Sequence, residues 1–255
     1  AAPEPIRRRR AEYPALAERA LSGDVPGSSA RGEQPKLTAY NEDAGHVIVK
    51  FSPASESPEA ARWRGLLRAE AHALEVVAEN GVEAALATLF EIEGRVFLES
   101  RRFDRVGACG RRPALSLSAV DTELAGVGVG WSRVSASLAQ QKLLSAETHR
   151  RIVWAETFGA WIGNTDMHLA NLSLAPAGKG FELLPVYDML PMHLAPVRGE
   201  LRSPDLRPPI RTRENEGCYE SAGAAAAVFW GRVSEDPKMS DEMRRVAWSE
   251  HSRGA

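Results

Sequence analysis

The stretch Gly163-Asn164-Thr165-Asp166-Met167-His168-Leu169-Ala170-Asn171 concentrates polar side chains at one point of the sequence. It places an aspartate, a histidine and two asparagines between an apolar helical pattern and two strand-like segments. A second aspartate, Asp188, closes the later segment in Pro185-Val186-Tyr187-Asp188. Carboxylate and amide oxygens are ligands that Mg²⁺ accepts, and a further carboxylate beside them can act as a base. This layout is typical of a phosphoryl-transfer site.

The composition is that of an ordinary folded protein. The 255 residues are 44% hydrophobic and 26% charged, which excludes a disordered chain and suffices for one large domain or two lobes. The net charge of −2 gives no overall indication of a nucleic-acid or membrane surface. The longest apolar run, 222–230, is far shorter than the roughly 20 residues of a membrane helix, and no secretory signal follows the basic start. Two cysteines cannot form a disulfide framework, so we expect a cytoplasmic protein with free, buried thiols.

Residues 1–27 form a basic N-terminal segment. It contains four consecutive arginines, Arg7 to Arg10, and a short helical pattern from Tyr13 to Leu21. Such a charge run is usually a solvated linker, and the alternative is an arm that contacts phosphates. Glycines and a proline between residues 23 and 27 end the segment.

Residues 28–105 are expected to form a small antiparallel sheet with one long helix. A loop of mostly small residues, 28–36, precedes the first strand and ends in Lys36. The alternation and turn residues predict four strands, at 37–40, 46–51, 86–90 and 95–99. The helix is predicted to begin after Ser57 as N-cap, with Pro58 in its first position, and to end at Asn80.

Two charged residues of this segment are expected to pair. Glu70 lies on the apolar stripe of the predicted helix, three residues after Leu67 and four before Leu74. A carboxylate that faces the core is costly unless a cation neutralises it. Lys50 on the preceding strand is the natural partner, and such a pair positions the ATP phosphates in protein kinases. The alternative is that Glu70 reaches solvent at the edge of the stripe and Lys50 is an ordinary strand-edge charge.

Residues 106–255 are expected to form a mainly helical lobe. Glycines and a proline between 107 and 113 mark its boundary, and a strong apolar helix is predicted from about Ser145 to Ile162. Strands at 172–174 and 181–184 then form a hairpin. Loops rich in proline and arginine follow, and the last forty residues are predicted to be helical with a break at Asp236-Pro237.

The order of these features along the chain is that of a protein kinase. In a kinase catalytic loop the base Asp and the metal-binding Asn are five residues apart, as Asp166 and Asn171 are. A hairpin then returns a second metal-binding Asp, which Asp188 would supply, and Lys50 and Glu70 form the upstream pair. We therefore expect an α+β, two-lobe protein-kinase-like fold, with a small antiparallel-sheet N-lobe, a mainly helical C-lobe, and ATP and Mg²⁺ as cofactors.

Several segments resemble a known family. Asn164–Asn171 and Leu184–Leu190 are similar to the signature of HipA-like serine/threonine kinases, the toxin components of bacterial type II toxin–antitoxin systems, and in particular to its YjjJ-like branch. The loop 28–36, ending in Gly-Glu-Gln-Pro-Lys, is similar to the phosphate loop of that family, and 102–105 is similar to its inter-lobe segment. The resemblance spans roughly residues 28–235.

The resemblance implies a role for each matching residue. It implies Asp166 as the catalytic base, and Asn171 and Asp188 as Mg²⁺ ligands. It implies that the ATP-binding residues are Lys50, Lys36, Gly32, Gln34, Glu70, Phe103 and His168. Ser29, with Ser28 beside it, matches the loop serine that the family autophosphorylates to switch itself off. A phosphate there would repel the nucleotide phosphates and expel the loop.

The resemblance also implies partners. The expected protein substrate is translation-related, by analogy an aminoacyl-tRNA synthetase, and the expected partner is an antitoxin of HipB type. DNA contacts are expected only indirectly or through a missing N-terminal part, and no membrane contact is expected. Arg31 and Arg101 depart from the small and the acidic residue that the family has there. Two alternatives stay open: a small-molecule kinase with the same site, and a catalytically weak, DNA-associated regulatory module.

Overall fold

Four strands form an antiparallel sheet in the first part of the chain. The computed structural model describes residues 9–23, 34–41, 44–201 and 205–254. The strands are β1 (Lys36–Asn41), β2 (Gly45–Phe51), β3 (Ala87–Ile92) and β4 (Arg95–Arg101), in the order β1-β2-β4-β3. Glu93 and Gly94 join β3 to β4 with φ values of 50° and 74°, the left-handed geometry of a tight hairpin turn. The four predicted strands are confirmed, with bounds that differ by at most two residues.

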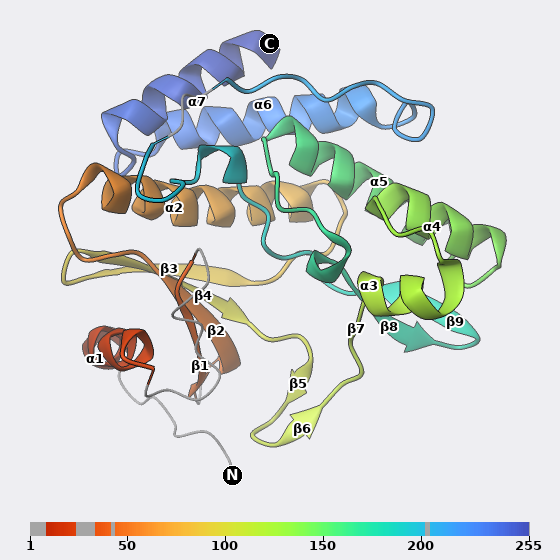
Figure 1. Cartoon of the computed structure of the whole chain (residues 1–255), viewed down its shortest axis with the longest axis horizontal. Coiled ribbons are helices and arrows are strands. Elements are labelled where there is room, and N and C mark those ends of the chain that lie inside the picture. The colour runs from red at the N-terminus through yellow and green to blue at the C-terminus, as the bar shows by residue number, and fades with distance from the viewer. Residues whose placement is uncertain (1–8, 24–33, 42–43, 202–204, 255) are drawn as a thin grey trace.

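Helices cover both faces of this sheet (Figure 1). Helix α1 (Arg9–Leu21) packs on one face through Tyr13 and Ala17, which are completely buried. Helix α2 (Pro58–Glu79) covers the other face. Ser57 is its N-cap, because the Ser57 Oγ accepts a hydrogen bond from the Ala60 N–H at 3.2 Å. The predicted start of this helix is confirmed.

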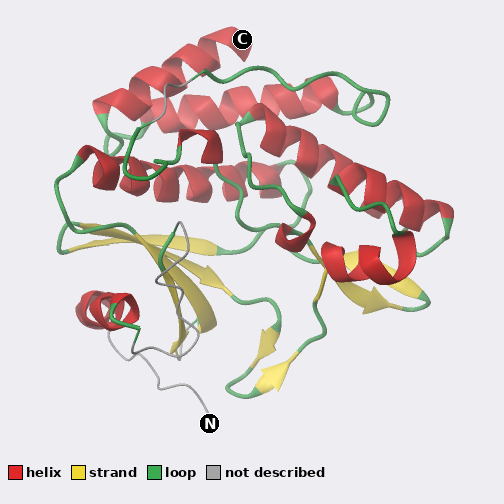
Figure 2. Ribbon diagram, viewed as in Figure 1, coloured by secondary structure: helices red, strands yellow, loops and turns green. Residues whose placement is uncertain are grey.

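The second part of the chain is mainly helical (Figure 2). Its helices are α3 (Leu117–Val120), α4 (Trp131–Gln140), α5 (Ala146–Trp161), α6 (Tyr219–Glu235) and α7 (Asp241–Gly254), with a π-helical turn at Asp121–Ala125 and 3-10 turns at Leu169–Asn171 and Met192–Leu194. A three-stranded sheet consists of β7 (Leu115–Ser116), β8 (Ser173–Ala177) and β9 (Gly180–Leu183), and β5 (Arg105–Val106) and β6 (Gly110–Arg111) form a separate hairpin. The predicted α+β architecture is confirmed.

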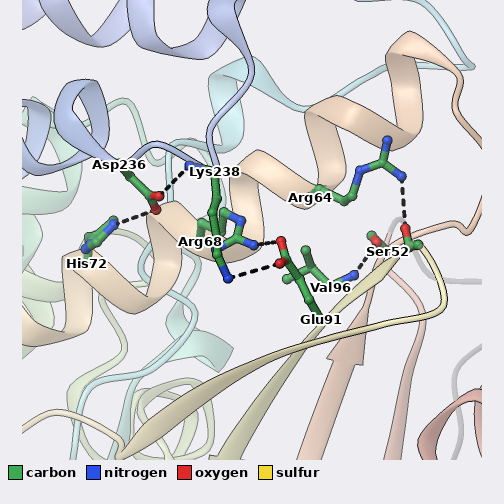
Figure 3. Close-up of polar contacts among 9 residues, drawn as sticks. Ser52, Arg64, Arg68, His72, Glu91, Val96, Asp236 and Lys238 are labelled. Atoms are coloured by element: carbon green, nitrogen blue, oxygen red, sulfur yellow. Dashed lines mark hydrogen bonds and ion pairs between the residues drawn. The ribbon is translucent and has the colours of Figure 1, made fainter.

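Charged side chains tie α2 to β3 and to the turn between α6 and α7 (Figure 3). Arg68 of α2 pairs with Glu91 of β3, and the Lys238 Nζ lies 3.0 Å from a second oxygen of Glu91. The His72 Nε2 lies 3.2 Å from the Asp236 Oδ2. Helix α2 is therefore held between the sheet and the C-terminal helices.

A buried arginine also joins α2 to the segment that follows Asp188. Arg62 is 1% exposed, and it donates hydrogen bonds to the Leu194 carbonyl at 2.8 Å and to the Glu242 carboxylate at 2.7 Å. Because Glu70 lies two turns further along the same helix, these contacts help to fix its position.

The two cysteines differ in their exposure to solvent. Both cysteines are free, but the expectation that both are buried is wrong for Cys109, which is exposed in the turn between β5 and β6. Cys218 is partly buried. Within the described ranges, the structure has no helix with the length and apolarity needed to cross a bilayer.

Candidate active site

Lys50, on β2, contacts two carboxylates. Its Nζ lies 2.6 and 2.7 Å from the two carboxylate oxygens of Glu70, and it also pairs with Asp188. Lys50 is 7% exposed and Glu70 is 1% exposed. The predicted Lys50–Glu70 pair is thus present, and Glu70 does not reach solvent.

Burial and charge act against each other at all three groups. Burial disfavours the ammonium form of Lys50, but Asp188 and Glu70 together outweigh it and raise the Lys50 pKa. Burial raises the pKa of Glu70, although Lys50 opposes this effect. Burial also works to raise the pKa of Asp188, but the charge of Lys50 outweighs it and lowers that pKa. Within this trio one cation serves two carboxylates, so an added divalent cation would be favoured.

A pocket of about 320 Å³ opens beside this trio, and both parts of the chain line it. Lys36 and Lys50 contribute from the first sheet, and Asn171 and Tyr187 contribute from the helical part. The rings of Phe103 and Tyr187 lie 5.9 Å apart at an interplanar angle of 37°. The pocket therefore combines cationic, acidic and aromatic walls, which suit a nucleotide.

Asp166 lies on the loop between α5 and the 3-10 turn, where three side chains hold it. The Asn164 Oδ1 accepts a hydrogen bond from the Asp166 N–H at 3.1 Å, and the Asn171 Nδ2 donates to the Asp166 carbonyl at 2.7 Å. The His168 Nε2 lies 2.7 Å from the Asp166 Oδ1. The Asp166 side chain is 45% exposed, so its carboxylate is oriented but open to an acceptor molecule.

Helices α4 and α5 support this loop. The Trp131 Nε1, in the first turn of α4, donates to the His168 carbonyl at 3.0 Å. Glu156 of α5 caps that turn by accepting a hydrogen bond from the Trp131 N–H at 2.6 Å. The loop also lies close to α5 at Gly159, where a Cβ would come within 2.3 Å of the Met167 sulfur. A side chain at this position would force the Met167 side chain to move.

Asn164 joins the two acidic segments. It is 4% exposed, and its Nδ2 donates to the Asp188 carbonyl at 3.0 Å while its Oδ1 binds the Asp166 N–H. Asp188 itself adopts the left-handed region, with φ of 53°, which aspartate tolerates better than most residues. The sequence analysis placed Asn164 in the polar stretch without predicting these contacts, although its position two residues before Asp166 was an available signal.

Asn171 and Asp188 suit a magnesium ion. Both line the pocket, and the amide nitrogen of Asn171 is engaged with Asp166, which leaves its carbonyl oxygen as the ligand atom. Mg²⁺ is usually bound through one or two protein oxygens together with phosphates and waters. This donor set therefore fits the ion that the sequence predicts.

Of the nine predicted site residues that the structure describes, six line one pocket, and Asp166, which contacts Asn171 of that lining, does not line it itself. Lys36, Lys50, Glu70, Phe103, Asn171 and Asp188 line the pocket. His168, expected to bind ATP, contacts Asp166 and is not among the residues that line the pocket, and neither is Gln34. Gly32, Ser28 and Ser29 lie outside the described residues. Sequence reasoning did not identify Tyr187, although it directly precedes Asp188.

The fold and the site define a two-lobe, protein-kinase-like protein. Similar folds are found in the HipA, HipB and operator DNA complex of Shewanella oneidensis (TM-score 0.59, 18% identity, 89% of this chain and 63% of that chain). They are also found in the Helicobacter pylori proinflammatory kinase CtkA (TM-score 0.55, 14% identity, 86% of each chain). At these identities the likeness shows the fold, which confirms the predicted kinase-like class.

The chain belongs to the HipA-like C-terminal domain family, which matches residues 28–247. It is also similar to Toxin YjjJ of Escherichia coli (strain K12), with 36% identity over 250 residues. That match covers 95% of this chain and 56% of the relative, so the chain spans little more than half of its length. The predicted family is confirmed.

Proposed function

We propose that this chain is an ATP- and Mg²⁺-dependent protein serine/threonine kinase that acts as a toxin. The observation that carries the proposal is that Lys50 joins Glu70 and Asp188 in a pocket lined by Asn171, which in turn contacts Asp166. We also propose that the two lobes divide near residue 105, where the chain leaves the first sheet. Residues 1–27 would then be an N-terminal extension of the N-lobe, 28–105.

The protein residues would carry the following roles. Lys50, held by Glu70, would bind the nucleotide phosphates. Asp166 would orient the acceptor hydroxyl and take its proton, for which its exposed carboxylate is suited. Asn171 and Asp188 would hold Mg²⁺, which when bound would neutralise charge on the phosphates. Lys36, Gln34 and Gly32 would cover the nucleotide, with Phe103 against it.

The relatives support the biological setting of this proposal. The E. coli relative is a toxin, and the Shewanella structure contains HipA together with HipB. We therefore propose an antitoxin of HipB type as partner. By analogy with the family, we propose a protein of the translation machinery, an aminoacyl-tRNA synthetase, as substrate. Ser29 or Ser28 would be the autophosphorylation site, and the protein would act in the cytoplasm.

Labelled ATP tests the proposal. The wild type should transfer label to protein, and Asp166→Asn should lower turnover by about 10²–10⁴-fold while keeping the thermal unfolding midpoint. Asp205→Asn, a matched change at an exposed aspartate, should leave turnover unchanged. Label lost from the Ser28→Ala/Ser29→Ala double variant would locate autophosphorylation.

Unchanged transfer by Asp166→Asn would rule out the assigned base. Transfer to a small molecule but never to protein would favour the small-molecule kinase. Absence of Mg²⁺–ATP binding together with salt-dependent DNA binding would favour the regulatory module.

A further inference from the structure

The segment 101–112, called here the arginine hairpin, carries a strong local charge. It contains five arginines, Arg101, Arg102, Arg105, Arg111 and Arg112, and one acidic residue, Asp104. The whole chain has a net charge of −2, so this positive charge is not a general property of the surface. It is concentrated on the strands β5 and β6 and on the residues that flank them.

Three of the five arginines are free to contact another molecule. Asp104 engages Arg102, at 2.8 and 2.6 Å, and also pairs with Arg105. Hydrogen bonds and charge from Arg102 and Arg105 outweigh burial and lower the Asp104 pKa, so this acid stays ionised. Arg101, Arg111 and Arg112 are exposed, and no carboxylate in the described parts of the chain pairs with them.

The arginine hairpin is held rigidly. A ring nitrogen of His46 lies 2.8 Å from the Ala108 carbonyl, which anchors the turn to β2. The Arg112 N–H donates to the Asp104 carbonyl at 3.0 Å. A Cβ at residue 110 would lie 2.4 Å from the Val106 carbonyl oxygen, so the close approach of the two strands requires Gly110. A partner would meet this surface without first ordering it, which favours affinity.

The arginine hairpin lies at the mouth of the nucleotide pocket. The first four residues of the hairpin, Arg101 to Asp104, line the pocket. Ala114, two residues after the end of the hairpin, also lines it. In Figure 1 the hairpin of β5 and β6 projects from the junction between the first sheet and the β7–β8–β9 sheet. A molecule bound to the hairpin would therefore lie beside the pocket.

The chemistry of the surface indicates a protein partner. Val106 is 46% exposed and lies with Ala108 and Cys109 between the arginines, so the charges surround a small apolar tip. Apolar contacts bordered by arginines are typical of protein interfaces. Single-stranded nucleic acids instead use aromatic stacking platforms, whereas the one aromatic residue in the sequence 101–112, Phe103, lines the pocket and is not at the exposed tip.

We propose that the arginine hairpin docks an acidic segment of the protein that accepts the phosphate. This inference rests on the proposed kinase function, because it names the substrate class of that same site. A guanidinium can bind a carboxylate through two parallel hydrogen bonds. An acceptor segment rich in glutamate and aspartate around its serine or threonine therefore fits the surface.

Binding of a fluorescein-labelled, glutamate-rich peptide with one central serine tests the proposal by anisotropy. Arg111→Glu/Arg112→Glu should weaken its affinity by on the order of tenfold, because attraction becomes repulsion at an exposed surface. Arg207→Glu/Arg213→Glu, which makes the same charge change on an exposed loop, should alter it less than about twofold. Added salt should weaken the wild-type complex. In phosphate transfer the hairpin variant should show a raised KM for this peptide and an unchanged kcat.

Each result separates the two proposals. Equal peptide affinity in wild type and hairpin variant would overturn the docking surface, whether or not phosphate is transferred. Tighter binding of poly(U) RNA, lost in the same variant, would overturn it in favour of a nucleic-acid surface. If the wild type transfers phosphate to no protein or peptide but still binds the peptide through Arg111 and Arg112, the hairpin remains an acid-binding surface and the kinase function is overturned.

Discussion

The Lys50–Glu70–Asp188 trio and the Asp166–His168 pair are adjacent parts of one site, but solvent reaches them very differently. The side chains of Lys50 and Glu70 are 9% and 2% exposed and that of Asp188 is 26% exposed, whereas those of Asp166 and His168 are 45% and 61% exposed. Ion pairs hold the trio together, whereas hydrogen bonds within an exposed loop hold the Asp166–His168 pair.

Because of this difference, the Lys50–Glu70–Asp188 trio and the Asp166–His168 pair contribute differently to the stability of the protein. A buried charge that loses its partner costs several kcal/mol, so the trio has to form whenever the protein folds. An exposed pair contributes little to stability, so the loop depends on backbone hydrogen bonds, on Asn164 and on Trp131 for its shape. Substitutions in the trio should therefore change stability, and substitutions in the exposed pair should change the reaction.

Lys50→Met should have the largest effect on stability. It leaves the buried Glu70 and the partly buried Asp188 without their cation, and we expect a loss of about 3–5 kcal/mol in the free energy of unfolding. Urea unfolding at pH 7 measures this loss. Lys36→Met, which removes an exposed lysine opposite Lys50 on β1, is the control and should cost far less.

The pH dependence of the same variant gives an independent check. In the wild type the Asp188 pKa is lowered. Its contribution to the free energy of unfolding is therefore fully present above the ordinary aspartate pKa of 3.8 and is lost as the pH falls below 3.8. Without Lys50, burial raises the Asp188 pKa above its value in the unfolded state. On acidification the folded state then binds a proton before the unfolded state does, so the variant becomes more stable as the pH falls from 7 toward 5. A variant that loses stability over this range would contradict the assigned charge pairing.

Asn164→Ala should affect both parts of the site. It removes a buried amide that binds the Asp166 N–H and the Asp188 carbonyl, so we expect a loss of about 1–3 kcal/mol. Turnover should fall on the order of 10²-fold, because Asp166 is no longer held in a fixed position relative to the pocket. Asn80→Ala, which removes an amide–carbonyl hydrogen bond at the end of α2, should leave turnover intact. A stable variant with full turnover would show that Asn164 does not connect the segments.

Tyr187→Phe should have a smaller effect. The hydroxyl lies 3.0 Å from the Ser173 Oγ and donates to the Ala170 carbonyl at 3.1 Å, so its removal should cost about 0.5–1.5 kcal/mol. The ring that faces Phe103 is retained, so the KM for ATP should not change. Tyr187→Ala also removes the ring and should raise that KM. If the two variants behave alike, the ring has no part in the pocket.

The Lys50–Glu70 pair could be predicted from the sequence because it follows from a local rule. A helical stripe placed Glu70 toward the core, and a buried carboxylate requires a cation. The N-cap at Ser57 was predictable for the same reason, since capping depends on adjacent residues. Such features need no knowledge of how distant segments pack.

The contacts that were not predicted depend on that packing. The Lys50–Asp188 pair and the Asn164–Asp188 hydrogen bond form only when the helical lobe meets the first sheet. The direction of the His168 side chain depends on the 3-10 turn that follows it, which periodicity does not reveal. The exposure of Cys109 likewise depends on a short hairpin that composition alone did not identify.

His168→Ala should have the smallest effect on stability, within about 0.5 kcal/mol, because the side chain is exposed. The structure places His168 against Asp166, whereas the resemblance implies a contact with ATP, and steady-state kinetics separates the two. If His168 orients Asp166, the variant should show a lower kcat with an unchanged KM for ATP, and His168→Gln, which keeps a donor, should restore part of the rate. A raised KM for ATP with an unchanged kcat would instead place His168 with the nucleotide. In that case the loop would have to change its conformation when ATP binds, and the exposed part of the site would be the part that moves.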